Sequence, residues 1–589
     1  MRRIDKRSGR VLLACLLSCV MPLSAADDAA NGVTEAAPAK TAAPAQTGSE
    51  IEQLKQMLAD QQKQINELRQ ALSQKKETDG KVAAAPAVQP AQPVDSTQVS
   101  AFPNFGQVAS TAVTLPRAAA TPAVPIPQAV VAKPAAKNPC EADPEGQSPT
   151  FIRLGSTCII PIGFMDLTAL WRDKNAGSSL GSNFGSVPYN NTTNAKNSEF
   201  RFTPQNSRIG FRVDGDWKDT HFIGYNEFDF LGTGGGTNYT VTNGAFVPRL
   251  RLFWVDARKG KVEFLAGQSW SMLTPNRRGI SALPGDLFYS QVIDVNYMAG
   301  LTWTRQPGMR VLYHPNNKAT LGLSFENPDQ YVGGSAGGSG ITLPAGLSAL
   351  APAQLDNAPN ISVANTVLAV PTVHPDIIAK IALDPTSRLH FEVAGMERTF
   401  KIWNPNTTGP GAGQYSTKAG GGVLVGLNAE VVKNFRLITS NYWSDGGGRY
   451  LFGQAPDTIV RADGSLSLVH AGGTVDGFEA RVKNWLFYGY YGGIYIGRNT
   501  ALDANGKTPI GFGYTSSPNS QNRMINEVTF GFNQTIWASP RYGAINAMGQ
   551  YEYLARNPWF VAPNNPKGTH DNTIYFNLRY TLPGGMPNF

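Results

Sequence analysis

Segments in which apolar and polar residues alternate repeat along the chain from residue 151 onwards, each about ten residues long. The last segment is the clearest, and its apolar residues are Ile574, Phe576, Leu578, Tyr580 and Leu582. The polar residues Asn577, Arg579 and Thr581 lie between them. A period of two is that of a β-strand, whose successive side chains point to opposite faces. The pattern therefore predicts an all-β C-terminal part.

Two kinds of connection separate these segments. Seven are short, at residues 215–218, 259–260, 315–318, 384–387, 433–434, 483–484 and 538–540. Eight are long, at about residues 174–197, 232–247, 271–297, 328–373, 403–418, 445–471, 500–520 and 556–571. Strict alternation of the two kinds predicts a 16-stranded antiparallel transmembrane β-barrel over residues 151–589, because short turns at one end and long loops at the other are typical of outer-membrane barrels. A sandwich in water shares the alternating side chains but not this order of turns.

The composition agrees with a barrel in lipid. Only 16% of the residues are charged, against about a quarter in ordinary soluble domains, and a lipid-facing Arg or Lys at mid-depth costs about 2–4 kcal/mol. A helical membrane protein is not expected, because no segment after the N-terminus has the roughly 18 consecutive apolar residues that a spanning helix needs. Aromatic residues near the strand ends are candidates for the interfacial girdles: Trp171, Trp254, Trp270, Trp443, Trp485 and Tyr553.

The lumen of a barrel this wide has room for water, whereas side chains fill an eight-stranded one. Residues that alternate with the apolar ones should line it, including Arg208, Arg212, Arg249, Arg251, Arg388 and Arg481. The same alternation places Leu252 and Trp254 on the lipid face with Leu250. A wide barrel with a polar wall is expected to be a passage for small hydrophilic solutes.

Arginine dominates the basic residues of the barrel region. From residue 151 to the end there are 23 Arg and 13 Lys against 29 Asp and Glu. Because guanidinium binds carboxylate or phosphate through two parallel hydrogen bonds, an arginine-rich wall should concentrate anions in the lumen. The alternative is that these arginines pair with carboxylates and only hold the wall together; the candidate partners are Glu227, Asp229, Glu263, Glu392 and Glu479.

The third long connection carries charges of both signs. Arg277 and Arg278 lie near its start, and Asp286 and Asp294 lie further on. Porins commonly fold this loop into the lumen, where the four charges would produce a transverse field at a constriction. The alternative is an outward loop whose charges are solvated. The longest connection, 328–373, has few charges and is assigned only to the outer rim.

The first 26 residues have the features of an export signal. Basic residues precede a short apolar core at Val11–Val20, and small side chains follow at Ser24–Ala26. Cys19 offers the alternative of a lipoprotein cleavage site. The mature protein is expected in the outer membrane of a Gram-negative bacterium, with its N-terminal part in the periplasm.

Residues 51–76 have the spacing of a short coiled coil. The a and d positions of successive heptads are Ile51, Leu54, Leu58, Gln61, Ile65, Leu68 and Leu72. The mixture of residues at these positions does not decide between a two-stranded and a three-stranded coiled coil. The alternative is a single amphipathic helix that lies on a surface. Residues 27–50 are expected to be flexible, and 77–150 to form an extended Pro/Ala-rich linker, because Pro disrupts helices and sheets while Ala offers little to bury.

The chain offers little support for metal, redox or catalytic chemistry. It has four Cys and six His without a CxxC pair or an HExxH motif, so no metal site, cofactor or catalytic residue is predicted. Cys140 and Cys158 are candidates for a disulfide in the oxidising compartment, with two unpaired thiols as the alternative. No nucleic-acid partner is expected.

Four short motifs, in this order, resemble the DcaP-like trimeric outer-membrane porins. They are Gln205–Phe211 (QNSRIGF), Arg249–Arg251 (RLR), Leu265–Ser271 (LAGQSWS) and Thr304–Pro307 (TRQP), the last followed by Arg310. The heptads and the Pro-rich linker strengthen the resemblance. It implies a homotrimer in outer-membrane lipid, uptake of small dicarboxylates, and pore-facing positions for Arg208, Arg249, Arg251, Arg305 and Arg310. The chain departs from the usual barrel terminus, because Pro583, Gly584, Gly585 and Pro587 interrupt the alternation before Phe589.

Two other functions are compatible with the same sequence features. A phosphate-selective porin shares the barrel and the basic lumen but would favour a ladder of Lys and Arg, and Lys is scarce on the predicted strands. A barrel anchor would instead use its stalk to bind peptidoglycan or a periplasmic partner. A TonB-dependent receptor needs about 22 strands and a plug domain, and residues 82–150 are too rich in Pro to build one.

Overall fold

The computed structural model describes residues 151–176, 178–232, 246–288, 291–333, 340–356 and 371–583. The predicted signal peptide, coiled coil and linker, with Cys19 and Cys140, lie outside the described residues, as does the terminal Phe589. No helix in the described part of the chain is long and apolar enough to cross a membrane.

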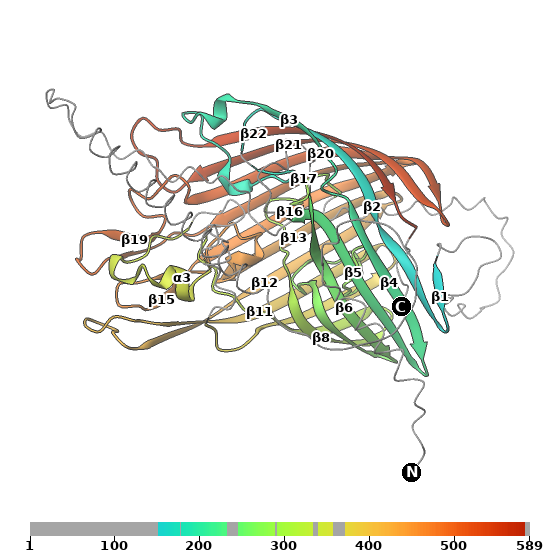
Figure 1. Ribbon diagram of the computed structural model, residues 1–589, viewed down its shortest axis with the longest axis horizontal. Coiled ribbons are helices and arrows are strands. Elements are labelled where there is room, and N and C mark those ends of the chain that lie inside the picture. Colours follow the sequence, from blue (N-terminus) through green and yellow to red (C-terminus); the bar gives the residue numbers. More distant parts are fainter. Residues whose placement is uncertain are drawn as a thin grey trace, which may run out of the picture. The chain divides into compact units, whose positions relative to one another are not determined.

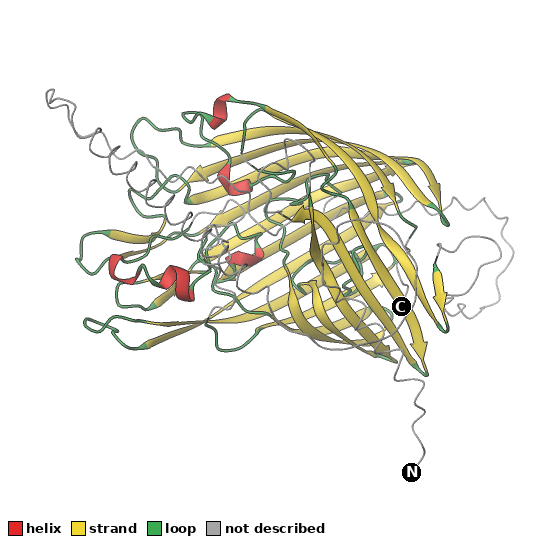
Figure 2. Cartoon of the chain, viewed as in Figure 1, coloured by secondary structure: helices red, strands yellow, loops and turns green. Residues whose placement is uncertain are grey.

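The described strands form a closed antiparallel barrel (Figures 1 and 2). The strand β2 (Thr157–Arg172) pairs with β4 (Arg208–Trp217) on one side and with the last strand, β22 (Thr569–Thr581), on the other. The strands between them pair in chain order: β5 (Thr220–Gly232), β6 (Val247–Lys259), β7 (Val262–Trp270), β8 (Arg305–Asn316), β9 (Ala319–Glu326), β10 (Asp376–Thr386), β11 (Leu389–Trp403), β12 (Tyr415–Val432), β13 (Phe435–Asp445), β16 (His470–Val482), β17 (Trp485–Ile496), β20 (Asn522–Ser539) and β21 (Gly543–Pro558). The predicted meeting of first and last strands is confirmed.

The sheet contains 18 strands, two of which are accessory. The three-residue strand β1 (Ile152–Leu154) forms a hairpin with the start of β2. The strand β3 (Glu199–Thr203) pairs with the far half of β2, and four residues later the chain continues as β4. The described barrel wall therefore has sixteen strands, as the turn pattern predicts.

Every predicted turn and loop marks a junction between consecutive strands of the barrel, although some strands extend into the predicted connections: β4 ends at Trp217 and β12 begins at Tyr415. The seven short turns lie at one end and the long loops at the other, the left end in Figure 1. Lys218, Asn434 and Lys483 have φ values of 56°, 67° and 54°, because tight hairpin turns need left-handed backbone. Two long loops carry small hairpins that the sequence does not predict: β14 (Thr458–Val460) with β15 (Leu466–Leu468), and β18 (Asn499–Leu502) with β19 (Pro509–Phe512). The helical pieces are also confined to loops: η1 (Phe184–Ser186), η2 (Asn194–Lys196), η4 (Ala345–Leu347), α3 (Leu350–Gln354) and η5 (Gly448–Tyr450).

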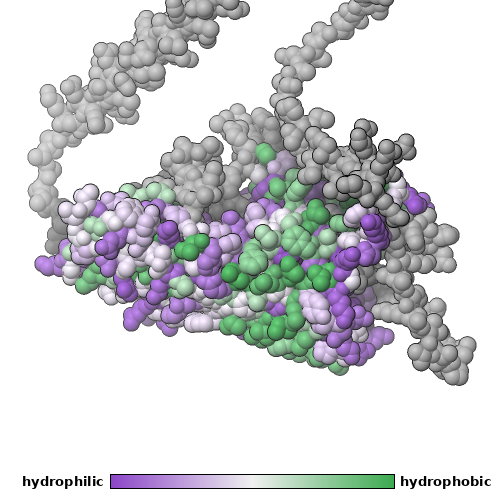
Figure 3. All heavy atoms as spheres, turned by 90° about the horizontal axis from the view of Figure 1, so that it is seen from below, coloured by the Kyte–Doolittle hydropathy of each residue, from purple (hydrophilic) through white to green (hydrophobic). Residues whose placement is uncertain are grey.

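The outer face of the wall is apolar and the inner face is polar. On β22, Ile574 and Phe576 are 50% and 55% exposed, whereas Asn577 and Arg579 are fully buried. Apolar side chains form a band across the barrel between more polar margins in Figure 3. The alternation therefore places the apolar residues toward lipid and the polar ones toward the lumen.

The predicted alternation is wrong in β6. Glu227 pairs with Leu252 and Phe228 with Leu250, so Arg251 is the extra residue of a β-bulge. The bulge turns Leu252 and Trp254 into the barrel, where both are buried.

The predicted girdle is correspondingly smaller. Trp254 stacks on Tyr225 inside the barrel, with ring centroids 5.2 Å apart, and the buried Trp270 also lies inside. Trp171, Trp443 and Tyr553 are exposed on the outer face. Trp485 is half-buried at the start of β17. Two of the six aromatic residues predicted for the membrane-interface girdles, Trp254 and Trp270, therefore lie inside the barrel instead.

An arginine introduced on the outer face should destabilise the barrel more near the middle of a strand than near its loop end. Phe576→Arg places a charge near the centre of β22 and is expected to lower the free energy of unfolding by about 2–4 kcal/mol. His570→Arg, on the same face at the loop end, should cost about 0–1 kcal/mol. Urea unfolding from lipid vesicles measures both, and equal losses would contradict the assignment of this face to lipid.

Candidate functional site

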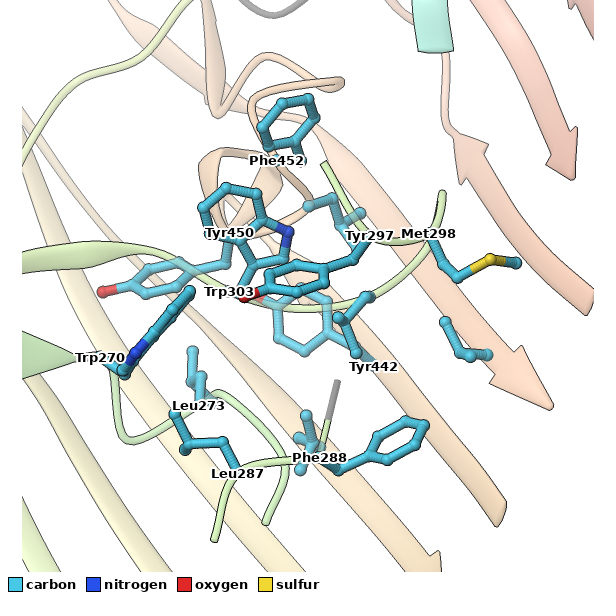
Figure 4. Packing of buried hydrophobic residues seen from close by; sticks show 14 of the residues in the cluster. Trp270, Leu273, Leu287, Phe288, Tyr297, Met298, Trp303, Tyr442, Tyr450 and Phe452 are labelled. Carbon is cyan, nitrogen blue, oxygen red and sulfur yellow. The ribbon is translucent and has the colours of Figure 1, made fainter. Parts of the chain in front are cut away.

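The loop between β7 and β8 lies inside the barrel. This inner loop, residues 271–304, is described except for 289–290. Leu273, Val292, Met298 and Ala299 are fully buried there. Figure 4 shows side chains of the inner loop, among them Leu273, Phe288 and Met298, packed together in front of barrel strands. The inner loop is longer than the predicted connection and narrows the space that the wall encloses.

Glycine allows the inner loop to touch the opposite wall. Gly300 has φ +89°, and a Cβ there would lie 2.3 Å from the carbonyl oxygen of Thr474 on β16. A Cβ at Gly492 on β17 would lie 2.2 Å from the carbonyl oxygen of Ala299. These distances exclude a side chain at both positions, so the backbones of loop and wall are in direct contact.

Wall carboxylates hold the inner loop through its backbone amides. Three such bonds run from Met272 N to Glu326 Oε1 (2.8 Å), from Asn276 N to Glu392 Oε1 (3.1 Å), and from Ala299 N to Glu527 Oε2 (2.8 Å). The acceptors come from β9, β11 and β20, on widely separated parts of the wall. Each bond satisfies a backbone amide of a buried loop residue, so the inner loop is fixed at several points.

The four charged residues of the inner loop have different surroundings. Arg277 donates to both carboxylate oxygens of Glu479, at 2.6 and 2.9 Å. Asp294 accepts from Ser182 N at 2.8 Å and from Tyr575 Oη at 3.0 Å. Both residues therefore anchor the loop to its surroundings.

The remaining two charges are more accessible. Arg278 is exposed, and Asp286 is only partly buried. Burial raises the pKa of the Asp286 carboxyl to about 6, against the opposing effects of Ser281 and Arg278. A transverse field from the inner loop would therefore come mainly from these two residues.

Four arginines and two carboxylates meet on the wall beside the inner loop. We call this group, formed by Arg208, Arg249, Arg251, Arg305, Glu227 and Asp229, the arginine cluster. Arg251 bridges Glu227 at 2.6 Å and Asp229 at 2.8 Å.

The other arginines of the cluster share the same two carboxylates. Arg249 pairs with Asp229 at 2.6 Å, and Arg208 lies 3.6 Å from Glu227. Arg305 interacts electrostatically with both carboxylates. The arginine cluster has two more positive than negative charges.

Aromatic rings support the arginine cluster. Trp303 lies 5.7 Å from Trp270 and 5.5 Å from Tyr297 between ring centroids, and the three side chains lie together in Figure 4. The guanidinium of Arg305 lies 5.6 Å from the Trp270 ring, and that of Arg251 lies 5.9 Å from it. Cation–π contacts of this kind favour a fixed position for the charged groups.

The other arginines predicted to line the pore lie in three environments. Arg212 is buried and pairs with Asp214 at 2.5 Å. Arg310 is buried near carboxylates, the largest electrostatic contribution coming from Glu263. Arg388 is exposed in the short turn between β10 and β11, outside the lumen wall.

A basic group near the short-turn end contains the predicted Arg277 and Arg481 together with Arg436, which was not among the predicted residues. Arg481 is half-buried near Glu479 and Arg277. Arg436 on β13 joins them electrostatically and donates to Asn428 Oδ1 at 2.8 Å. The alternation in β13 could have identified Arg436, because Ile438 and Ser440 follow it on the same inward face.

Other missed arginines form buried ion pairs within the wall. Arg398 pairs with Asp376 at 3.0 Å and with Asp457 at 2.9 Å, and Arg579 pairs with Asp166 at 2.7 Å. These pairs match the alternative in which arginines hold the wall together. The sequence could not distinguish them from pore-lining arginines, because both types occupy inward positions.

Cys158 forms a disulfide. It is fully buried on the inward face of β2, near the short-turn end. The partner cysteine lies outside the described residues, so pairing with Cys140 remains a prediction.

Comparison with solved structures finds barrels of the outer membrane. The chain is similar in fold to the outer-membrane channel DcaP of Acinetobacter baumannii, with a TM-score of 0.52 and 16% identity over 74% of this chain and 99% of that one. An anion-selective porin from Comamonas acidovorans has a TM-score of 0.39 and 10% identity over 72% and 99% of the two chains. Of these two, only DcaP is similar enough to support the fold, and at this identity the likeness concerns the fold alone.

The predicted resemblance to DcaP is confirmed at this level. No protein-family model matches the chain, and no curated protein matches it.

Because the backbones of the inner loop and the wall are in contact at Gly300, adding a single methyl group there should displace the loop. Gly300→Ala should strain the left-handed backbone by roughly 1–3 kcal/mol and displace the loop from Thr474. Thermal unfolding should then begin at a lower temperature, and single-channel recordings should show more open-channel noise. Gly395→Ala is the control, because a Cβ there meets nothing within 4 Å. Identical behaviour of the two variants would show that the loop is not clamped at Gly300.

Proposed function

We propose that the protein is an outer-membrane diffusion channel for small hydrophilic anions, with dicarboxylates as the preferred class. The observation that carries this proposal is a closed barrel, apolar outside and charged inside, in which an anchored loop narrows the lumen beside an excess of arginine. A lumen of sixteen strands is the architecture of a solute passage. The similarity in fold to DcaP supports the same proposal.

The arginine cluster supports the preference for anions. Its two carboxylates neutralise two of the four guanidinium groups, so an excess of two charges matches a dianion. Arg249 and Arg305 are only partly buried, and a guanidinium can bind a carboxylate through a planar pair of hydrogen bonds. Arg208 and Arg251 are buried and would act through their electrostatic field. Such groups gain strength in a narrow site with low-dielectric walls.

The alternative functions receive less support from the wall. A phosphate-selective ladder needs several lysines along the lumen, and Lys380, on the inward face of β10, pairs with Glu392 at 2.8 Å. A barrel that served only to attach the stalk to the membrane would not require an inner loop fixed to its wall. We also propose a homotrimer in the outer membrane. The N-terminal part would lie in the periplasm, because β2 begins at the short-turn end of the barrel.

Planar bilayers test the proposal directly. The purified full-length protein should open discrete conducting steps, and the reversal potential in a salt gradient should show preference for anions. Succinate, added as a dianion, should reduce the chloride current as it occupies the channel. Absence of current would favour an anchor, and strong cation selectivity would exclude the anion channel.

Removing one charge from the arginine cluster should reduce anion selectivity. A unit charge about 6 Å from a passing anion contributes about 0.7 kcal/mol in water, so Arg305→Ala should lower the anion-to-cation permeability ratio about threefold or more. Arg388→Ala removes the same charge from the exposed turn and should leave the ratio unchanged. Reversal potentials measure both variants. An equal effect of the two would assign selectivity to the total charge of the protein.

Asp286 predicts a dependence of selectivity on pH. Its pKa of about 6 lies above the ordinary value of about 3.9, so the folded protein holds this proton more tightly than the unfolded chain. Stability from this group is present below about pH 4 and is lost as pH rises toward 6. Ionisation also adds a negative charge to the lumen, so anion selectivity should be higher at pH 5 than at pH 7.

The Asp286→Asn variant isolates this effect. Its amide cannot ionise, so the change in reversal potential between pH 5 and pH 7 should be smaller than in the unmodified protein. A change of the same size in both proteins would assign the pH dependence to other groups.

A further inference from the structure

One sector of the outer face has no outward carboxylate among its described strands. This sector consists of β17, β20, β21 and β22. The strand β17 contains no acidic residue, and Glu527, Glu552 and Asp571 on the other three are buried on the inward side. Any basic residue on the outer face of this sector therefore lacks a carboxylate from its own strands.

Two arginines lie against one tryptophan at the long-loop end of the sector. The guanidinium carbons of Arg498 and Arg523 lie 6.0 and 5.2 Å from the centroid of the Trp559 ring. Both arginines are exposed, and in the described part of the chain neither forms an ion pair. We call these three residues the outer arginine pair and its tryptophan.

The backbone fixes this arrangement. Asn522 pairs with Pro558 and Met524 with Asn557, so Arg523 is the extra residue of a β-bulge, a feature that re-aims a side chain. The indole of Trp559 donates to the carbonyl oxygen of Ile496 at 2.9 Å.

A close loop contact supports the same residues. A Cβ at Gly513, whose φ is +78°, would lie 2.8 Å from both the Cβ of Arg498 and the ring of Trp559. Close packing against Gly513 therefore fixes the base of the Arg498 side chain and the Trp559 ring.

Aromatic neighbours place the pair at the membrane surface. Trp559 lies 6.2 Å from Tyr495, and Tyr495 lies 6.4 Å from the exposed Trp443, between ring centroids. Exposed aromatic residues at strand ends form the girdle at the level of the lipid head groups. Because the long loops of such barrels face the outside of the cell, this position corresponds to the outer leaflet.

We propose that Arg498, Arg523 and Trp559 bind a phosphorylated glycolipid of the outer leaflet. Each guanidinium can hold a phosphate through two charge-assisted hydrogen bonds, and the indole offers an apolar surface to the adjoining sugar and acyl chain. Complementary charge favours this occupant, since the sector has a fixed positive pair at head-group level and no outward carboxylate on its strands. This binding site is independent of solute transport through the lumen.

Native mass spectrometry of delipidated protein tests the proposal, with diphosphoryl lipid A as the probe. The unmodified protein should bind the probe at least tenfold more tightly than the double variant Arg498→Ala/Arg523→Ala. The double variant Arg498→Lys/Arg523→Lys, which keeps both charges, should retain part of the affinity. Arg541→Ala is the matched control, because Arg541 lies 5.5 Å from the Tyr542 ring near the short-turn end; it should bind as the unmodified protein does.

Heat-modifiable migration on gels should be the same for all four proteins, which establishes that each barrel is folded. Equal binding of dephosphorylated lipid A would overturn the proposal. So would full competition by inorganic phosphate, which would identify a site for the free ion. An oligomer that dissociates in the Ala variant while lipid binding stays unchanged would instead identify this sector as an interface between copies of the chain.

Discussion

Hydrogen bonding between β2 and β22 is the interaction on which the rest of the structure depends. Backbone groups in hydrocarbon have no water to bond, so an open sheet edge is excluded and the first and last strands must pair. Closure gives every strand one lipid face and one lumen face. The chemistry of each side chain then follows from its position in the alternation, and a single extra residue exchanges the faces. The bulge at Arg251 does this in β6, where it moves Leu252 and Trp254 from lipid into the lumen.

The inner loop is a consequence of that enclosed space. Its buried backbone needs hydrogen-bond partners, and the wall supplies carboxylates such as Glu392 and Glu527 at the required positions. Glycine at position 300 removes the side chain that would prevent contact with β16. The same acidic residues that make the lumen polar therefore also fix the inner loop. A wall charge cannot be assigned to solute selection until its bonds to the inner loop are known.

Local patterns predict the wall well and the lumen poorly. Strand positions and turns follow from the period of two and from turn residues, which are properties of neighbouring residues. The bulge at Arg251 depends on pairing with β5, and the partner of Arg277 is Glu479, about two hundred residues away in the chain. Arg388 has the inward parity of its strand but falls in the turn, because β11 begins one residue later. Arg436, by contrast, could have been found from the alternation of β13 alone.

The number of arginines in the barrel is a poor measure of the net charge that a solute in the lumen would meet. An arginine such as Arg579, which is buried against Asp166, contributes almost no net field at a distance, because the two charges nearly cancel. Excess charge arises only where arginines outnumber the carboxylates that they contact, as Arg208, Arg249, Arg251 and Arg305 outnumber Glu227 and Asp229. That excess lies beside the inner loop, inside the barrel, where low-dielectric walls screen Coulomb interactions less than bulk water does. For the proposed selectivity, the excess of arginine over acidic residues in this one cluster therefore matters more than the larger number of arginines in one-to-one ion pairs elsewhere in the wall.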